Sequence, residues 1–415
     1  MIDHKLIKKH AEKNAKACGA FLRDMCRIPA TSNQEGPVVA RVKKEMLKVG
    51  FDQVKIDKYG SIYGRIGKGK RVIAIDAHLD TVGIGDPAEW KWDPFKGKFE
   101  KGVIWARGAS DQRGGMAAMV YAGKMIKDLN LAADCTIWMV GAICEEDSDG
   151  ISWLYTLKEN VIKPEVVVVT EPTNCKIYRG HRGRMEIKVK IPGKSCHGSA
   201  PERGINPIYR AAPFIEEIKK LNHKLKPHKF LGKGTICVTE IKEEGPSQCA
   251  VPGSVTLHLD RRLEPQTSKL DAVKEVKAAL KRVGIKDAKV WIPVYTEPSW
   301  RKTVYPMEQY YPGWCLEPSH SLVKIAEKTY NTAFNTKKAP VDKWVFSTDG
   351  TAITGLCGVP SIGFGAGEED NAHTVVEHIR VEQLVKAMQF YTTFPTIYCE
   401  AGGLKASEKK YKAKK

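Results

Sequence analysis

Short runs of consecutive apolar residues alternate with helical patterns over roughly the first 175 residues of the chain. The runs are RVIAIDA (71–77), TIWMVGAI (136–143) and EVVVVT (165–170), and the amphipathic pattern GGMAAMVYAGKMIKDLN (114–130) separates the first two. Continuous β-branched runs with helices between them are typical of strands that are buried on both faces. The pattern therefore predicts a mostly parallel sheet in an α/β domain.

From about residue 180 polar and apolar residues begin to alternate, which is typical of strands with one face in solvent. Two amphipathic helical patterns separate these segments. The order along the chain is strand, helix, strand, strand, helix, strand, which predicts a split, ferredoxin-like α+β unit. The predicted strands are 184–191, 235–244, 254–263 and 288–294, and the predicted helices are 206–222 and 267–284.

After about residue 296 the α/β character resumes, with helices predicted at 319–334 and 380–394. We therefore expect a first domain built from residues 1–179 and 297–400, an inserted α+β domain of residues 180–296, and a basic tail, 401–415, that is frayed. A chain of 415 residues is long enough for two hydrophobic cores.

Composition narrows the class of protein. Apolar residues make up 42% and charged residues 28% of the chain, as in ordinary globular enzymes. No apolar run approaches the ~18 residues of a membrane span. The first 30 residues form a charged amphipathic pattern without the apolar core of a signal peptide, and the eleven cysteines stand singly with no Cys-x-x-Cys pair. We expect reduced thiols and a cytoplasmic location.

The formal net charge of +19 allows two interpretations. One is an anionic partner such as nucleic acid. The other is a solvated, lysine-rich surface, which the sequence favours because the lysines are spread along helices and the tail rather than gathered beside aromatic residues. We therefore expect neither a nucleic-acid partner nor a membrane partner.

Polar residues that could carry chemistry follow the predicted strands. His78 and Asp80 come directly after the run 71–77, and sites in open α/β sheets form at the carboxyl ends of strands. Asp80 is compatible with a strand-end turn, or with a partner that fixes the tautomer of His78. Asp111 lies among glycines before a helical pattern, where taken alone a helix N-cap is the simpler interpretation.

Four further residues lie in equivalent places. Glu145 and Glu146 follow the run 136–143, and adjacent carboxylates at the end of a buried strand repel each other unless a cation or proton intervenes. Glu171 follows the run 165–170, and His373 comes after the apolar SIGFGAG (361–367). Each is a weak signal alone, but together they predict a metal site. Nitrogen and carboxylate ligands suit zinc, cobalt or manganese, and the number of acids is enough for two divalent ions.

The motifs that carry these residues resemble those of the M20 metallopeptidase family. AHLDTV, RGASDQRGG, the EED after Cys144, VVVTEP and AHTVVEH occur in the family's order, and the resemblance spans about residues 5 to 395. Within the family the chain most resembles the acetylornithine deacetylase and succinyl-diaminopimelate desuccinylase branch, and in particular a bacterial subgroup of selenium-metabolism-linked hydrolases. The first domain would then be a catalytic, metal-binding domain and the inserted one a lid and dimerisation domain.

The resemblance implies a role for each position. Asp111 would bridge two divalent metal ions, one also held by His78 and Glu171 and the other by Glu146 and His373. Glu145 would remain off the metals as general base and acid, and Asp80 would support His78. The implied function is metal-dependent hydrolysis of a small amide, by a water that attacks the carbonyl while Glu145 takes its proton.

Four residues outside this set are further candidates. His197 matches the histidine that stabilises the oxyanion from the partner subunit of a homodimer, although alone it would be interpreted as an ordinary exposed histidine. Asn206 and Arg262 are candidate ligands of a substrate carboxylate, and for Arg262 a surface salt bridge is equally compatible. Gly365 could offer its N–H to the same carboxylate, or simply serve a tight turn.

The sequence also departs from the family pattern and leaves alternatives open. Gln112 follows Asp111, and Arg113 stands where the family often has lysine; neither is expected to touch the metals. The aromatic and basic segment 296–320 matches no family motif and is a candidate lining of the substrate pocket. The glutamate at position 171 mildly favours a deacylase. A dipeptidase or carboxypeptidase is the alternative. A non-catalytic binding protein on the same fold is the alternative from another class.

Overall fold

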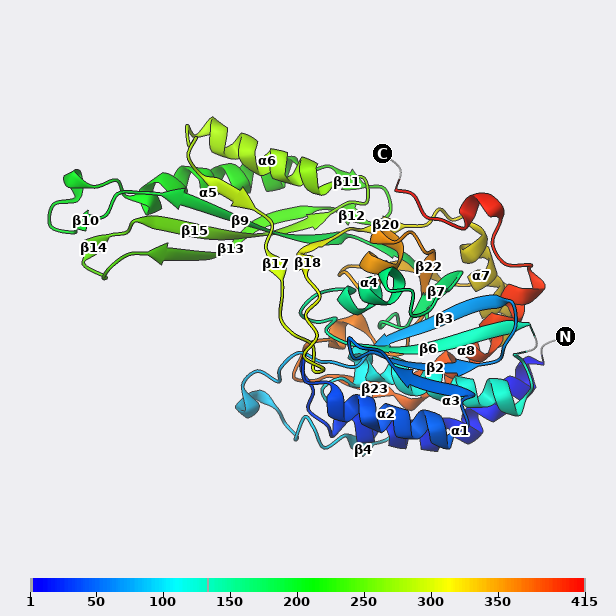
Figure 1. Cartoon of the computed structure of the whole chain (residues 1–415). Coiled ribbons are helices and arrows are strands. Elements are labelled where there is room, and N and C mark those ends of the chain that lie inside the picture. The colour runs from blue at the N-terminus through cyan, green and yellow to red at the C-terminus, as the bar shows by residue number, and fades with distance from the viewer. Residues whose placement is uncertain (1–2, 133, 414–415) are drawn as a thin grey trace.

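A computed structural model describes residues 3–132 and 134–413 (Figure 1). Its central nine-stranded sheet has the order β1-β2-β6-β3-β7-β22-β8-β20, and β21 pairs with β8. The β6–β3, β3–β7 and β7–β22 pairings at the centre are parallel, whereas those of β1, β2 and β20 are antiparallel. The strands are β1 (Gln53–Ile56), β2 (Ile62–Ile66), β3 (Arg71–His78), β6 (Cys135–Ala142), β7 (Val166–Val169), β8 (Ile177–His181), β20 (Trp314–Cys315), β21 (Val341–Trp344) and β22 (Ser361–Gly363).

The sheet is mixed at its edges because β2 returns from β1 as a hairpin, and the predicted parallel arrangement applies to its centre. In Figure 1 α4 lies on one side of strand β3, and α1, α2 and α3 lie on the other. α8 packs against α1, α3 and α7. These helices are α1 (His4–Cys26), α2 (Gly36–Lys48), α3 (Gly114–Asp128), α4 (Ile151–Lys158), α7 (Ser321–Phe334) and α8 (Val381–Glu400). A small sheet of β4 (Lys98–Glu100), β5 (Val103–Trp105) and β23 (His378–Arg380) flanks them.

A second sheet with its own apolar core projects from this body (Figure 1). Its strands run β13-β15-β9-β16, all antiparallel, and α5 and α6 pack together beside it. The chain order β9, α5, β13, β15, α6, β16 confirms the predicted split α+β unit. The elements are β9 (Gly183–Pro192), α5 (Pro207–Lys224), β13 (Thr235–Glu244), β15 (Ser254–Leu263), α6 (Lys269–Arg282) and β16 (Lys289–Trp291). The exact domain boundaries remain predictions.

Short strand pairs complete the fold. β10 (Cys196–His197) pairs with β14 (Ala250–Val251) at the far end of the second sheet, and β11 (Pro227–His228) pairs with β12 (Gly232–Lys233) at its near end (Figure 1). β17 (Val294–Tyr295) pairs with β18 (Met307–Glu308), and β19 (Tyr310–Tyr311) adds to β9. The segment between β17 and β18 packs on the first domain, because Trp300 donates to the carbonyl of Gly60 (3.1 Å) and Tyr305 packs against Tyr59 and Tyr155.

Two expectations are wrong. The tail is not frayed over its described part: the N–H of Tyr411 donates to the carbonyl of Gly358 (2.8 Å), and its hydroxyl accepts from the N–H of Cys315 (3.2 Å). An aromatic residue among the lysines gives the tail something to bury. The cysteines are also not all reduced, because Cys135 and Cys399 form a disulfide between β6 and α8, while the other nine are free. In the described part of the chain no helix is long and apolar enough to cross a membrane.

Candidate metal centre

The carboxyl end of β3 brings His78 next to Asp111. His78 is the last residue of the strand, and its Nε2 lies 2.9 Å from Oδ1 of Asp111. Asp111 belongs to the turn η2 (Ala109–Arg113), which leads directly into α3. Its second oxygen, Oδ2, lies 3.4 Å from Nε2 of His373. Asp111 therefore stands between two imidazoles, with one carboxylate oxygen toward each.

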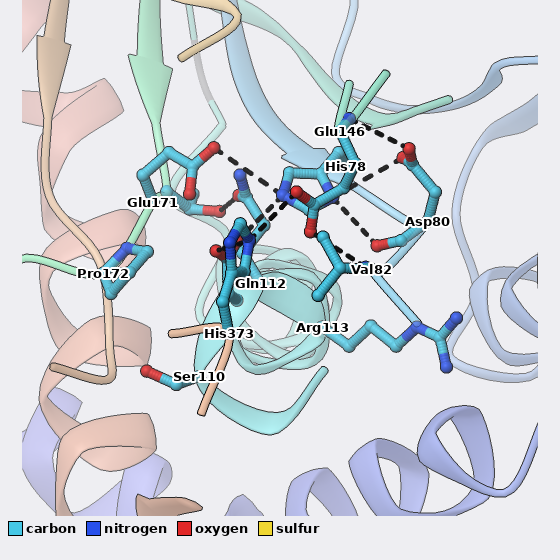
Figure 2. A network of polar contacts seen from close by, with 12 residues as sticks. His78, Asp80, Val82, Ser110, Gln112, Arg113, Glu146, Glu171, Pro172 and His373 are labelled. Atoms are coloured by element: carbon cyan, nitrogen blue, oxygen red, sulfur yellow. Dashed lines mark hydrogen bonds and ion pairs between the residues drawn. The ribbon is translucent and has the colours of Figure 1, made fainter. Parts of the chain in front are cut away.

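One glutamate lies beside each imidazole. Oε1 of Glu171, which follows β7, is 3.7 Å from Nε2 of His78, and Oε2 of Glu146, which follows β6, is 3.0 Å from Nε2 of His373. Figure 2 shows Glu171, Glu146 and His373 gathered around His78. The five side chains thus form two sets, His78 with Glu171 and Glu146 with His373, and Asp111 is shared between them.

Asp80 supports the far side of the His78 ring (Figure 2). Nδ1 of His78 lies 3.0 Å from the backbone oxygen of Asp80 and 3.5 Å from its Oδ1. The other carboxylate oxygen of Asp80 accepts from the hydroxyl of Ser32 (2.7 Å) and the N–H of Glu146 (3.1 Å). Nδ1 thus faces the oxygens of Asp80 and Nε2 faces Asp111, so Nε2 is the ring nitrogen positioned to bind a cation. Asp80 also ties the backbone of Glu146 to His78.

Glu145 lies beside the first set, close enough to be counted with it as a candidate ligand, and its place off the metals stays a prediction. Its carboxylate, that of Glu171 and the ring of His78 offer ligand atoms within 4.8 Å of one another, and Glu145 is only 6% exposed. Burial, and then the negative charge of Asp149, raises the pKa of Glu145 well above its usual value. A buried carboxyl with a raised pKa is suited to proton transfer.

The chemistry of this donor set fits a pair of divalent cations. Burial and then the charge of Asp111 raise the pKa of both Glu146 and Glu171, because like charges lie close together away from water. Oε2 of Glu171 is buried and has no hydrogen-bond partner among the described residues. Buried carboxylates that lack counter-charge are costly, and imidazole and carboxylate ligands are those that zinc, cobalt and manganese accept.

A buried ion pair positions Asp111 from behind. Oε2 of Glu377 accepts from Nη1 of Arg107 (2.7 Å), while Oε1 accepts from the backbone N–H groups of Ser110 (2.9 Å) and Asp111 (3.1 Å). Arg107 also donates to the carbonyl of Thr374 (3.3 Å), next to His373. The pair therefore fixes the turn of Asp111 and the loop of His373 relative to each other.

The family model described as peptidase family M20/M25/M40 matches residues 74–396, a span that contains all five of these side chains and Glu145. The chain belongs to this family. It is therefore a metal-dependent hydrolase with a mixed α/β fold.

Relatives and solved structures extend the match to nearly the whole chain. The uncharacterised protein YgeY of Escherichia coli K12 is 47% identical over 395 residues, 95% of this chain and 97% of that protein. A probable succinyl-diaminopimelate desuccinylase of Staphylococcus epidermidis is 24% identical over 409 residues, 92% of this chain and 97% of its own length. The YXEP protein of Bacillus subtilis, described as a dinuclear metal-binding peptidase of the M20 family, has the same fold with a TM-score of 0.70, 13% identity and 94% and 99% coverage of this chain and its own.

The two departures from the M20 pattern hold the turn η2 in place. Arg113 is buried and donates to the carbonyl oxygens of Leu79 (2.9 Å) and Met25 (2.8 Å). Oε1 of Gln112 accepts from the hydroxyl of Thr170 (2.8 Å). These contacts anchor the end of the turn that follows Asp111.

The structure does not bring His197 to the metal centre of its own chain. His197 lies in β10, exposed at the end of the inserted domain that is remote from β3 (Figure 1), and its Nδ1 accepts from the hydroxyl of Ser199 (2.7 Å). An exposed imidazole at the tip of a projecting domain is positioned to reach another subunit. Its role stays a prediction.

The three candidate substrate ligands have contacts of their own. Oδ1 of Asn206 caps α5 by accepting from the N–H of Ile208 (2.9 Å). Arg262 donates to both oxygens of Asp260 (2.8 and 3.1 Å), the salt bridge that the sequence also allowed. The N–H of Gly365 donates to the hydroxyl of Thr173 (2.9 Å). A substrate carboxylate would have to displace or share these partners, and the three roles stay predictions.

Sequence analysis missed an acidic group near Glu145. Oδ1 of Asp149 accepts from Nη2 of Arg184 (2.7 Å), at the start of β9, and its Oδ2 accepts from the hydroxyl of Ser347. Asp349 is fully buried, and neither of its carboxylate oxygens has a hydrogen-bond partner among the described residues. In the sequence, the only signal of Asp349 was the short polar run STDG (347–350) next to β21. No pattern in the neighbouring sequence indicates that this run lies beside Glu145.

Metal-free protein is expected to lose stability as the pH rises from about 5 to 9. Burial raises the pKa of Glu377 to about 7, so the folded state holds that proton more strongly than the unfolded one and loses stability as the group ionises. Hydrogen bonds to Asp111 and then Glu146 raise the pKa of His373 to about 10, and their stabilisation is lost as the ring deprotonates. Both effects lower the free energy of unfolding as the pH rises.

Bound metal takes the place of the proton on His373, so the gain in melting temperature on adding Zn²⁺ should widen as the pH rises. Thermal unfolding in chelator and in Zn²⁺, followed at several pH values, checks this. A metal-free melting temperature that stays constant or rises with pH would contradict the assigned electrostatics.

Proposed function

We propose that the protein hydrolyses a small linear amide, an N-acyl or N-carbamoyl amino acid or a short peptide, with two divalent metal ions as cofactors. Zinc is the favoured ion, with cobalt or manganese as alternatives. The observation that carries the proposal is the position of Asp111 between two imidazoles, each with its own glutamate. The dinuclear metal binding named for the B. subtilis relative supports the same assignment.

In this proposal His78, Asp111, Glu146, Glu171 and His373 hold the ions, and Asp80 orients His78. When bound, two divalent cations polarise an amide carbonyl and lower the pKa of a water molecule. A carboxylate oxygen of Glu145 takes the proton of the attacking water and then passes it to the departing nitrogen. The burial of Glu145 supports this role, because a carboxyl shielded from water keeps the proton until it passes to the departing nitrogen.

We further infer a homodimer in which His197 of one subunit completes the active site of the other. Its Nε2 would donate to the oxyanion that forms when the carbonyl is attacked. The bond from Ser199 to Nδ1 supports this, since it engages Nδ1 and leaves Nε2 as the ring nitrogen for a ligand. Asn206, Arg262 and the N–H of Gly365 would bind the substrate carboxylate after the lid closes.

The screen that tests the function offers metal-loaded protein N-acetyl, N-succinyl and N-carbamoyl amino acids beside dipeptides with a free carboxylate. We expect hydrolysis of one of the acyl or carbamoyl amino acids that is abolished by a chelator and restored by Zn²⁺. Preference for dipeptides instead would make the protein a dipeptidase or carboxypeptidase. Hydrolysis that survives metal removal, or metal-loaded protein that binds these amides without cleaving them, would overturn the proposal.

A further inference from the structure

A large groove lies at the junction of the inserted domain, the first domain and the tail. Its volume is about 1060 Å³, and it is lined by segments 227–230 and 265–266 of the inserted domain, by Arg179 and 315–320, and by the tail residues 406–412. β11, β20 and the C-terminal segment, which supply or adjoin these lining residues, lie close to one another in Figure 1. None of its lining residues belongs to the metal centre. The volume is that of a site for a small molecule.

The walls of the groove carry an excess of positive charge. Two carboxylates line it, Glu317 and Glu408, and Glu408 already accepts from the backbone N–H of Ser321 (3.1 Å) and from its hydroxyl. The cations come from three separate segments of the chain, and three of the five belong to the tail segment 409–412. They are Arg179, Lys229, Lys409, Lys410 and Lys412.

Arg179 places one of these charges in the wall itself. It is 8% exposed, and its Nη1 contacts Sγ of Cys315 (3.2 Å) and the carbonyl oxygen of Leu316. Its guanidinium also stacks on Phe230, with Cζ 3.5 Å from the ring centroid. These partners are neutral, so they satisfy its hydrogen bonds and packing without cancelling its charge. An anion in the groove would be attracted to a cation that is already desolvated and held in place.

Two imidazoles add neutral donors. Nδ1 of His228 accepts from the N–H groups of Phe230 (3.2 Å) and Leu231 (3.0 Å), and Nδ1 of His320 accepts from the N–H of Leu322 (3.1 Å). Each neutral ring therefore carries its proton on Nε2, where it can donate to an oxygen. Burial lowers the pKa of both rings.

We propose that this groove binds a small, multiply charged anion bearing phosphate or carboxylate groups. The buried Arg179, the lysines from two separate chain segments and the two Nε2–H donors match such a ligand. Because its walls come from both domains and the tail, an occupant would link the inserted domain to the first. The packed tail is then part of a binding site, and its lysines have a role that is separate from the metal centre.

The test uses full-length, metal-loaded protein and the fluorescent trisulfonate 1-hydroxypyrene-3,6,8-trisulfonate, whose anisotropy reports binding. The Lys229→Ala/Lys412→Ala variant removes one exposed cation from each of two walls and should weaken binding about fivefold or more. The control is Lys5→Ala/Lys9→Ala on the exposed face of α1, with the same change of charge, which should bind as the unaltered protein does. Competition by adenosine 5′-monophosphate and by tricarballylate then shows whether phosphate or carboxylate is preferred.

Absence of binding, or equal loss in both double variants, would overturn the proposal, because the attraction would then be due to net charge alone. A DNA duplex that displaces the probe more strongly than either small anion, and loses affinity with the Lys229→Ala/Lys412→Ala change, would also overturn it in favour of a nucleic-acid surface. Hydrolysis of amides is not part of this readout, so the result stands independently of the proposed function.

Discussion

The Glu145→Gln protein is expected to bind two divalent ions per chain yet turn over its amide substrate about 10²–10⁴ times more slowly than the unaltered protein. The substitution keeps the size of the side chain and removes only its ability to exchange a proton. Glu145 offers a ligand atom within 4.8 Å of His78 and Glu171, but the proposed assignment gives the metals to other side chains, so metal binding should not depend on it. Metal analysis of the purified protein gives the number of ions bound per chain. Kinetics with the best amide substrate give kcat.

The neighbouring residue supplies the matched control. Glu146→Gln is the same chemical change one position further along, but it removes a carboxylate that contacts His373 at 3.0 Å. This variant should lose metal together with activity. If Glu145→Gln stays fully active, or if it is Glu145→Gln that loses metal while Glu146→Gln keeps it, the two roles have been assigned wrongly.

Mixing two inactive proteins is expected to restore activity. A His197→Ala chain keeps its metal ligands and lacks the donor, while an Asp111→Ala chain lacks the bridge and keeps the donor. One oxyanion donor contributes about 10²–10³ in kcat, so each parent should be nearly inactive. A mixed dimer has one complete site, and equal mixing should recover about a quarter of the activity of the unaltered protein under the statistics of a closed two-fold dimer.

The rate of amide hydrolysis is measured after subunit exchange. Mass spectrometry or two affinity tags verify that mixed dimers have formed. The position of His197 at the remote end of the inserted domain is the physical reason to expect this result (Figure 1). Recovery should be absent when two Asp111→Ala chains are mixed. Verified mixed dimers that remain inactive would show that no active site is completed by the partner.

The centre of the sheet and the proposed metal ligands could be predicted because their signals are local. A run such as 165–170 identifies a buried strand by itself, and the residue that follows a parallel strand must lie at its carboxyl edge. His78 ends β3 and Glu171 lies just after β7, and these two strands pair directly with each other, so the proximity of the two residues is a consequence of the topology. The same argument could not place Asp111, and the family resemblance supplied its role.

What the sequence did not reveal depends on contacts between distant segments. The pairing of Asp149 with Arg184 joins the loop after Glu146 to the inserted domain, and the disulfide of Cys135 with Cys399 spans 264 residues. Neither pairing leaves a periodic pattern. Tyr411 is a similar case, since a single aromatic residue among lysines does not indicate that the tail packs. These contacts are set by the closing of the fold, which single-sequence patterns do not record.

The central claim is that Asp111 and the four side chains around it hold two ions that hydrolysis requires. The most direct measurement titrates metal-stripped protein with Zn²⁺ and follows bound metal and turnover of the amide together. We expect activity to appear on titration and to level off at about two ions per chain, because both ions contribute to activating the water and the carbonyl. Full activity in the stripped protein, or saturation with no ion bound at these residues, would contradict the account.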